Sequence, residues 1–223
     1  MTHANLLTAQ NIDWSLYAIL DKECAKERSL ARLAEEAIQG GAGILQLRNK
    51  ISTSDEFYSD ALKIKEVARH FKIPFIINDR VDIALALKAD GAHLGQDDLP
   101  FAEARKLLGK QMILGVSVHN FNEFEIALKG KPDYWGVGTI YPSLSKTELQ
   151  SAGIKIIEQL RPKTTLPLIA IGGITVENLE PVIQAGADGV AVISDLFGRK
   201  NVCSRAQEFV KEVKQVKDSL VVA

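Results

Sequence analysis

Short apolar runs alternate with longer amphipathic stretches along almost the whole chain, and this alternation restricts the fold more than any other feature. Each apolar run is bounded by Gly, Pro, Asp or Asn, which is typical of buried parallel strands. The expected strands are residues 15–20, 43–47, 74–77, 92–94, 112–115, 134–137, 168–171 and 189–193. Strands that alternate with helices indicate βαβ units, and therefore a parallel sheet.

Amphipathic helices are expected between these strands. Clear helical periodicity covers residues 29–39, 55–70, 176–185 and 205–216. For residues 55–70 the pattern predicts a buried face formed by Tyr58, Ala61, Leu62 and Val67. Eight strand–helix units in roughly 200 residues favour a closed barrel over an open doubly wound sheet, which usually has fewer strands. The expected fold class is therefore α/β, a (β/α)₈ TIM barrel.

The length and composition of the chain suit this fold. With 223 residues, it lies near the short end of the range for such barrels, and 46% hydrophobic residues provide a substantial core. No linker or low-complexity tract interrupts the pattern. We expect one domain over residues 1–223, with residues 1–14 as an N-terminal extension and residues 15–218 as the barrel.

The net charge, the cysteine spacing and the length of the apolar runs also exclude several classes of protein. The net charge of −1 favours neither nucleic acid nor a membrane surface as a partner, so a bound anion must be held by local basic groups. Cys24 and Cys203 match no metal-ligand spacing and suit a reducing compartment. The N-terminus lacks the pattern of a signal peptide, and no apolar run reaches the ~18 residues of a membrane span. We expect a soluble, cytoplasmic protein.

Functional groups of a (β/α)₈ barrel lie at the C-terminal ends of its strands, while the opposite rim serves stability. Polar side chains gather directly after most of the expected strands. These segments are residues 46–50, 78–80, 95–98, 117–119, 138–146, 172–173 and 194. The pattern therefore predicts a functional site at this rim.

Two pairs of charged residues in these segments each have a functional and a structural interpretation. Arg48 and Lys50 lie on the same side of a strand end, where they could hold a phosphate chain, or they form a solvated surface pair. Asp79 and Asp98 follow neighbouring strands, and two carboxylates there suit Mg²⁺. Alternatively, each of these aspartates caps the helix that follows it.

A glycine pair and a histidine complete the set of candidates. Gly172 and Gly173 follow the seventh strand and would let backbone N–H groups approach an anion. The standard phosphate site of these barrels lies there, and Ile193 and Ser194 would supply the part after the eighth strand. His119 is the one histidine expected on this rim. No base–nucleophile arrangement surrounds it in the sequence, which favours a structural role.

The order and spacing of these motifs resemble the thiamine-phosphate synthase family from about residue 16 to residue 194. The segments that carry the resemblance are residues 46–50, 77–80, 93–98, 115–119, 171–174 and 187–194. Members of this family join a hydroxymethylpyrimidine diphosphate to a thiazole phosphate and release pyrophosphate. The resemblance implies the barrel fold, a transferase activity, Mg²⁺ as cofactor and these two small molecules as partners. It is compatible with a homo-oligomer.

The resemblance also assigns roles, position by position. The implied ligands of the pyrimidine diphosphate are Gln46, Arg48, Lys50, Asn78, Ser117 and Lys146. Of these, Arg48, Lys50, Ser117 and Lys146 form the implied catalytic set. Asp79 and Asp98 are similar to the Mg²⁺ ligands, and Gly173, Ile193 and Ser194 to the thiazole-phosphate site.

The sequence departs from the family pattern in two places. Asn49 stands where the family usually has Glu, and Ser143 and Ser145 stand where it usually has two threonines. Serine keeps the hydroxyl donor and loses a methyl group. Ser143 and Ser145 are therefore still expected to bind a substrate phosphate.

The family's reaction is thought to begin with departure of pyrophosphate, which leaves a stabilised pyrimidine cation for the thiazole nitrogen to capture. Such chemistry needs charge neutralisation on the leaving group rather than a strong base. Three implied cationic side chains and one Mg²⁺, less two carboxylates, give a site charge of about +3, against roughly −2 to −3 for a diphosphate ester.

Two other functions are compatible with a barrel of this kind. A thiazole-phosphate tautomerase of a related barrel family would use His119 as acid or base, and a non-catalytic sensor would only bind pathway phosphates. The pairs Arg48/Lys50 and Asp79/Asp98 argue against both, because neither protein needs a pyrophosphate clamp or a metal.

Overall fold

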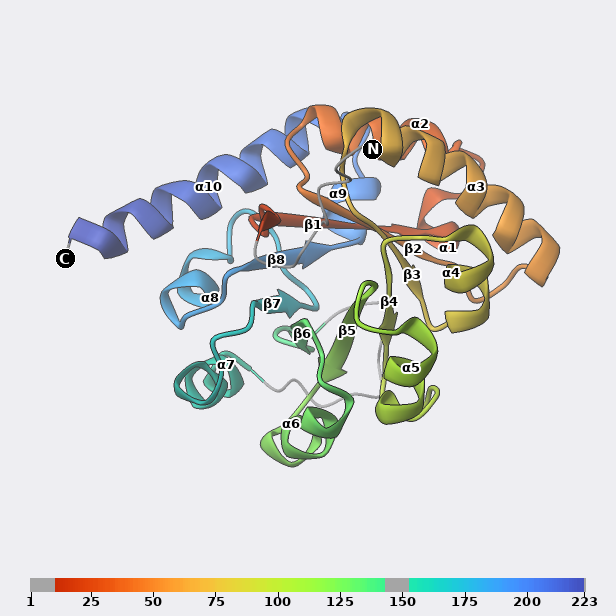
Figure 1. The fold of residues 1–223 in the computed structure, drawn as a ribbon. Helices are drawn as coiled ribbons and strands as arrows, with labels where there is room; N and C mark the ends of the chain where they lie inside the picture. Colours follow the sequence, from red (N-terminus) through yellow and green to blue (C-terminus); the bar gives the residue numbers. More distant parts are fainter. Residues whose placement is uncertain (1–10, 143–152, 223) are drawn as a thin grey trace, which may run out of the picture.

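The computed structural model describes residues 11–142 and 153–222, in which eight parallel strands close into a barrel in sequence order (Figure 1). The strands are β1 (Leu16–Asp21), β2 (Ile44–Arg48), β3 (Phe75–Asn78), β4 (Gly91–Leu94), β5 (Ile113–Val118), β6 (Tyr134–Gly138), β7 (Leu168–Ile171) and β8 (Gly189–Val192). The last strand pairs with the first through Tyr17 and Ala191. The expected (β/α)₈ barrel is confirmed.

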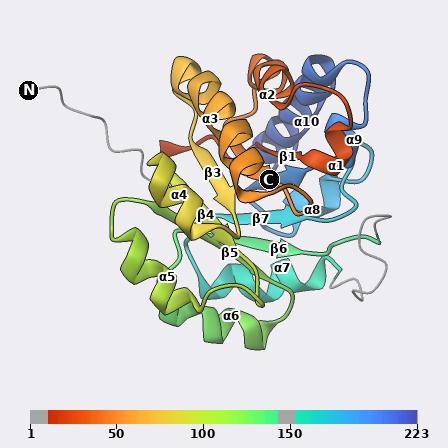
Figure 2. The ribbon, with the colours of Figure 1, turned by 90° about the vertical axis from the view of Figure 1, so that its right-hand side faces the viewer.

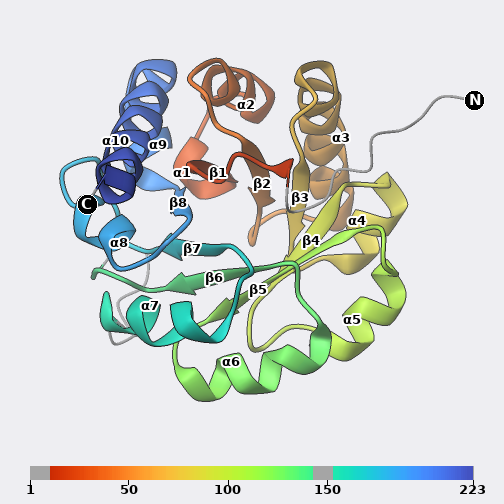
Figure 3. The ribbon, with the colours of Figure 1, turned by 60° about the vertical axis from the view of Figure 1, so that its left-hand side comes forward.

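Helices surround the strands on the outside. They are α1 (Lys22–Ala25), α2 (Leu30–Gln39), α3 (Ser54–Phe71), α4 (Val81–Leu87), α5 (Phe101–Leu108), α6 (Phe121–Ala127), α7 (Lys155–Leu160), α8 (Glu180–Gln184), α9 (Ser194–Phe197) and α10 (Val202–Val222). Two 3₁₀ turns, η2 (Leu128–Gly130) and η3 (Arg161–Lys163), follow α6 and α7. Helices α2, α3 and α10 cover one side of the barrel, and α5, α6 and α7 the opposite side (Figures 2 and 3).

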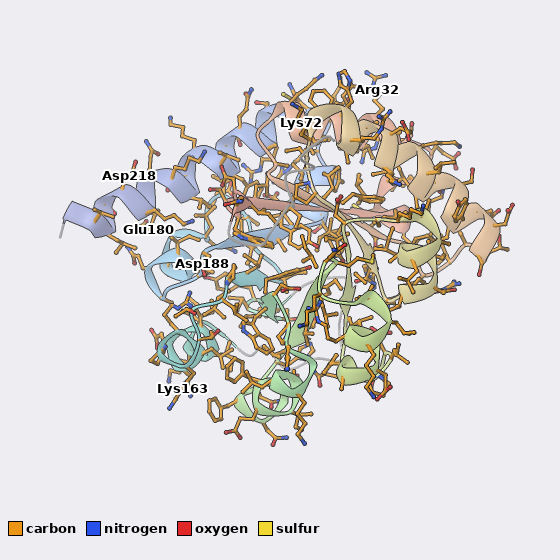
Figure 4. All side chains as sticks on the ribbon, viewed as in Figure 1. Arg32, Lys72, Lys163, Glu180, Asp188 and Asp218 are labelled. Atoms are coloured by element: carbon orange, nitrogen blue, oxygen red, sulfur yellow. The ribbon has the colours of Figure 1, made fainter. Side chains whose placement is uncertain are left out.

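The outer surface of this helical layer is charged. Arg32, Lys72, Lys163, Glu180 and Asp218 are exposed and lie on the outside of the molecule, away from the strands (Figure 4). Within residues 11–142 and 153–222, no helix has both the length and the apolar character needed to cross a membrane.

The barrel encloses an inner core that is separate from the core between strands and helices. Alternate residues of each strand point inward, as the pleat of a strand requires. The inner core consists of Ile12, Trp14, Tyr17, Ile19, Ile44, Ile76, Ile113, Tyr134, Ile169 and Ala191. Ile12 and Trp14 thus pack inside the barrel although they precede β1. The division at residue 14 into extension and barrel stays a prediction.

Aromatic rings close the inner core toward the N-terminal ends of the strands. The ring of Trp14 lies 4.8 Å from that of Tyr134, and the rings of Tyr17 and Tyr134 are 5.8 Å apart, centroid to centroid. Tyr134 has room because β5 carries glycine opposite it: a Cβ on Gly115 would lie 2.1 Å from Cζ of Tyr134. These rings form a solid floor, and the space above it is left for a site.

The buried face predicted for residues 55–70 is largely wrong. The buried side chains of α3 are Phe57, Ala61, Ile64 and Ala68, whereas Tyr58 and Leu62 are 38% and 44% exposed. A capping box between Thr53 and Glu56 starts the helix at Ser54. The stripe that begins at Phe57 follows the helical period of 3.6 residues more closely, and it is the one that packs on the barrel.

Three other elements begin or end at different residues than the sequence predicts, and these differences do not change the fold. Strand β5 continues to Val118 instead of ending at residue 115, so that Ser117 lies within the strand. The helix expected at residues 176–185 is shorter, because α8 begins at Glu180. The last helix is longer than residues 205–216 and extends from Val202 to Val222.

Candidate functional site

A cavity of about 350 Å³ lies above the aromatic floor, at the C-terminal ends of the strands. The predicted site residues that line it are Gln46, Arg48, Asn78, Ser117, Ile193 and Ser194. The wall also includes Tyr17, Ile19, Asp21, Glu23, Cys24, His93, Tyr134, Gly136, Ile169, Ile171 and Ala191. The lining combines apolar side chains with neutral polar groups, which suits a planar heterocycle with polar edges, and Asp21, Glu23 and Arg48 add charged groups.

A continuous series of hydrogen bonds crosses the bottom of this cavity. Nε2 of Gln46 donates to the Tyr17 hydroxyl at 2.7 Å, and that hydroxyl lies 2.8 Å from the hydroxyl of Tyr134. The Tyr134 hydroxyl lies 2.9 Å from Nδ1 of His93, whose Nε2 lies 2.8 Å from Oγ of Ser117. Two expected ligands, Gln46 and Ser117, are thus joined through three residues that the sequence analysis did not select.

Both tyrosines in this series are neutral phenols. Tyr17 and Tyr134 are completely buried, and burial raises the pKa of each hydroxyl above its ordinary value. His93 also corrects the expectation that His119 is the one histidine on this rim. His119 itself pairs with Glu123 through Nδ1 at 2.8 Å and does not line the cavity.

Arg48 has a partner that the sequence analysis missed. Its Nη1 forms an ion pair with Oδ2 of Asp21, a side chain that is only 7% exposed at the end of β1. Oδ1 of Asp21 meanwhile accepts a hydrogen bond from the backbone N–H of Cys24 at 3.0 Å and caps α1. Asp21 therefore fixes the direction of the Arg48 guanidinium and leaves other N–H donors of that group for an anion.

The two predicted metal ligands lie close together. Asp79 has a left-handed backbone (φ 63°), and its N–H donates to the carbonyl of His93 at 2.9 Å. Burial and the neighbouring Asp98 carboxylate raise the pKa of Asp79, while Nζ of Lys50, 3.4 Å away, acts in the opposite direction. Neither carboxylate caps a helix: α4 and α5 are preceded by Arg80 and Pro100, which make no side-chain cap.

This acidic pair fits a divalent cation. The Asp98 carboxylate raises the pKa of Asp79, and a cation between the two side chains would relieve this repulsion. Oδ2 of Asp98 is already held by the N–H of Gly95 at 2.7 Å. No group of three or more His, Cys, Asp or Glu side chains that could hold a metal exists among the described residues. Such a site is incomplete without water and substrate oxygens, which is the usual situation for Mg²⁺.

A smaller cavity of about 40 Å³ adjoins the first one after β7 and β8. It is lined by Ile171, Gly172, Gly173, Ile174, Ala191, Val192, Ile193 and Ser194. Gly172 and Gly173 have φ values of 102° and 61°, which only glycine adopts readily. A Cβ on Gly173 would lie 2.8 Å from the carbonyl oxygen of Pro142. The chain thus provides a narrow recess bordered by backbone, at the place where these barrels bind phosphate.

An ion-pair network holds the far side of this recess. Arg205 of α10 binds Asp195 at 2.5 Å and Glu177 at 2.9 Å. Asp195 directly follows Ser194, the first residue of α9. The ion pair between Arg205 and Asp195 therefore ties the start of α9 to α10.

The remaining predicted positions differ in their surroundings. Lys50 is half exposed and lies beside Asp79. Oδ1 of Asn49 accepts hydrogen bonds from the N–H groups of Ile51 and Ser52, while its buried Nδ2 has no partner among the described residues. Ser143, Ser145 and Lys146 lie outside the described residues.

Comparison with known proteins agrees with this geometry. The family described as thiamine monophosphate synthase matches residues 16–196. A thiamine-phosphate synthase of Clostridium acetobutylicum is 41% identical over 206 residues, covering 92% of this chain and 98% of that protein. One from Halalkalibacterium halodurans is 43% identical over 198 residues, covering 88% and 94%.

A solved structure gives the same result in three dimensions. The thiamine phosphate pyrophosphorylase from Pyrococcus furiosus is similar with a TM-score of 0.83 and 32% identity, covering 92% of this chain and 97% of that one. The chain therefore belongs to the thiamine-phosphate synthase family and has its activity, that of a transferase that releases pyrophosphate.

Proposed function

We propose that the chain couples hydroxymethylpyrimidine diphosphate to thiazole phosphate and forms thiamine phosphate and pyrophosphate. The observation that carries this proposal is a cavity for a heterocycle whose wall includes Arg48 and Asn78, with Asp79 of the acidic pair directly after Asn78 in the chain. Gln46, Asn78 and Ser117 would bind the pyrimidine ring inside the cavity. The diphosphate would extend outward to the mouth, where Arg48 is oriented by Asp21.

The diphosphate is held by charge. Arg48, Lys50 and Lys146 would contact its oxygens, and Asp79 and Asp98 would hold Mg²⁺ beside it. When bound, Mg²⁺ supplies positive charge to the leaving group. The sequence analysis did not count Asp21, whose carboxylate adds one negative charge beside Arg48. With Asp21 included, the net charge of the diphosphate site falls from about +3 to about +2.

The phosphate group of thiazole phosphate would occupy the smaller cavity. Gly173, Ile193 and Ser194 surround the recess that would take its phosphate, and Ser143 and Ser145 would add hydroxyl donors. The two cavities share Ile171, Ala191, Ile193 and Ser194, so the thiazole ring would lie next to the pyrimidine. The transfer requires the two rings to be adjacent, because the thiazole nitrogen must reach the methylene carbon of the pyrimidine.

The reaction follows from this arrangement. The C–O bond between the pyrimidine's methylene carbon and the diphosphate breaks, the electron pair leaves with pyrophosphate, and the thiazole nitrogen forms the new C–N bond. Fixed cations around the diphosphate stabilise the charge that it gains, and they need no reorganisation as the bond breaks. The chain needs no strong general base for these steps.

The decisive experiment is direct. Purified protein with both substrates and Mg²⁺ should release one pyrophosphate per thiamine phosphate formed, and omission of either substrate should stop product formation. Both the tautomerase and the sensor interpretations expect no pyrophosphate, so its absence would reject the proposal. We further propose that the protein acts in the cytoplasm on these small molecules.

A further inference from the structure

The hydrogen bonds at the bottom of the cavity form a series from Gln46 through Tyr17, Tyr134 and His93 to Ser117. Four contacts of 2.7 to 2.9 Å join five polar groups. Gln46 is 2% exposed, both tyrosines are at most 1% exposed and His93 is 8% exposed, so water cannot readily replace these contacts. Each contact therefore needs one hydrogen supplied from within the series.

The position of each hydrogen follows from the first donor. An amide nitrogen only donates, so the Tyr17 hydroxyl accepts from Gln46 and gives its own hydrogen to Tyr134. The Tyr134 hydroxyl then gives its hydrogen to Nδ1 of His93. A neutral imidazole that accepts at Nδ1 carries its hydrogen on Nε2, which donates to Oγ of Ser117.

We propose that this series is a proton-ordering relay that fixes His93 as the Nε2–H tautomer and makes the Ser117 hydroxyl a hydrogen-bond donor toward the cavity. At the other end, the amide oxygen of Gln46 makes no hydrogen bond with any described residue, so it is an acceptor toward the same cavity. His93 and Tyr134 are positioning residues: they act on a substrate only through Ser117.

This order defines the molecule that the bottom of the cavity recognises. A ring bound there must offer a donor to Gln46 and an acceptor to Ser117. An aminopyrimidine has both, since its exocyclic amine donates and its ring nitrogens accept. This specificity step rests on the proposed function, whereas the order of the protons does not.

The order of the protons can be measured without substrate. In protein with ¹⁵N-labelled histidine, long-range ¹⁵N–¹H correlation spectra show which ring nitrogen carries hydrogen. His93 should be protonated on Nε2 alone, while His119, whose Nδ1 faces the Glu123 carboxylate at 2.8 Å, should be protonated on Nδ1 and serves as an internal contrast. His93 is assigned by the loss of its signals in His93→Gln, or by elimination through replacement of the other three histidines. A hydrogen on Nδ1 of His93 would overturn the relay.

The functional consequence is tested by a double-mutant cycle. His93→Gln keeps an amide donor that can reach Ser117, and His93→Leu does not. The kcat/KM for the pyrimidine diphosphate should be at least about 10-fold higher in His93→Gln than in His93→Leu, with the KM for thiazole phosphate equal in both. In a Ser117→Ala background this difference should vanish, because no hydroxyl is left to orient.

A difference that persists without the Ser117 hydroxyl would mean that His93 acts through packing, and the positioning role would be rejected. Thermal denaturation of all four variants separates loss of fold from loss of orientation. If no variant and no wild-type sample releases pyrophosphate, the proposed function fails, but the tautomer measurement still decides the relay.

Discussion

Replacement of Gly136 by alanine would add one methyl group to the cavity where we place the pyrimidine ring. Gly136 lies in β6 and lines the cavity. A Cβ at this position would lie 3.0 Å from Cε1 and 3.4 Å from Nε2 of His93, and 3.6 Å from Oγ of Ser117. The contact with Ser117 is ordinary, and the imidazole must move by a few tenths of an ångström. The methyl group would therefore occupy space next to the polar end of the cavity.

The expected effects on binding and on stability differ in size. One extra methyl group in a fitted pocket changes substrate discrimination by about 1–3 kcal/mol, so kcat/KM for the pyrimidine diphosphate should fall roughly 10- to 200-fold. Gly-to-Ala replacement in a compatible backbone adds ~0.4–1 kcal/mol of stability through the unfolded state. The tight contact with His93 opposes this gain, so the melting temperature should stay within ~4 °C of wild type.

The assay is steady-state pyrophosphate release together with thermal denaturation, and Gly109→Ala is the matched control. Gly109 follows α5 with φ 68° and has no atom within 4 Å of an added Cβ. Its replacement should lower stability by ~1–2 kcal/mol through backbone strain and leave kcat/KM unchanged. If a well-folded Gly136→Ala enzyme keeps the wild-type KM for the diphosphate substrate, the pyrimidine does not bind beside Gly136.

Three further predictions concern the metal and residues 143–146. EDTA should abolish turnover and Mg²⁺ should restore it while circular dichroism stays unchanged; full activity in EDTA would remove Asp79 and Asp98 from the mechanism. Alanine at both Ser143 and Ser145 should chiefly raise the KM for thiazole phosphate, and a rise confined to the diphosphate would assign these serines to the other substrate. Lys146→Ala should lower kcat ~10²–10³-fold, because in the proposed function its ammonium would stabilise the charge that grows as pyrophosphate leaves. A variant that keeps more than about half of the wild-type rate would contradict this role.

The fold was predictable because buried parallel strands appear in the sequence as short apolar runs bounded by turn residues. Every expected strand overlaps an observed one, since a short apolar run flanked by turn residues usually forms a buried strand. The face of α3 was not predictable with equal success. Tyr58 and Leu62 are large and apolar, yet the phase of the helix is set by its cap at Thr53, and that phase turns Phe57 and Ile64 inward instead.

The site was predictable only in part, for a geometric reason. Arg48, Asn78 and Ser194 directly follow the expected strands and line the cavity. Tyr17, His93 and Tyr134 lie within strands and were overlooked, although inward-pointing positions of a strand face the same space. His93 pairs in register with Asn78 and with Gly115, so its place beside the cavity follows from alternation once the register is known. The register between neighbouring strands is set by tertiary packing and cannot be read from a single sequence.

The missed residues change how the site is understood electrostatically. Charged groups are confined to the mouth, where Arg48 is balanced by Asp21 and Lys50 by Asp79. The bottom of the cavity carries neutral donors and acceptors in a fixed order. A substrate that lies across both regions would have its anionic part among cations and its ring among oriented dipoles. When the bond between them breaks in the proposed reaction, the leaving half gains negative charge among these cations. Because the fixed charges act on the leaving group and the groups around the ring only orient it, the proposed reaction does not require a general base.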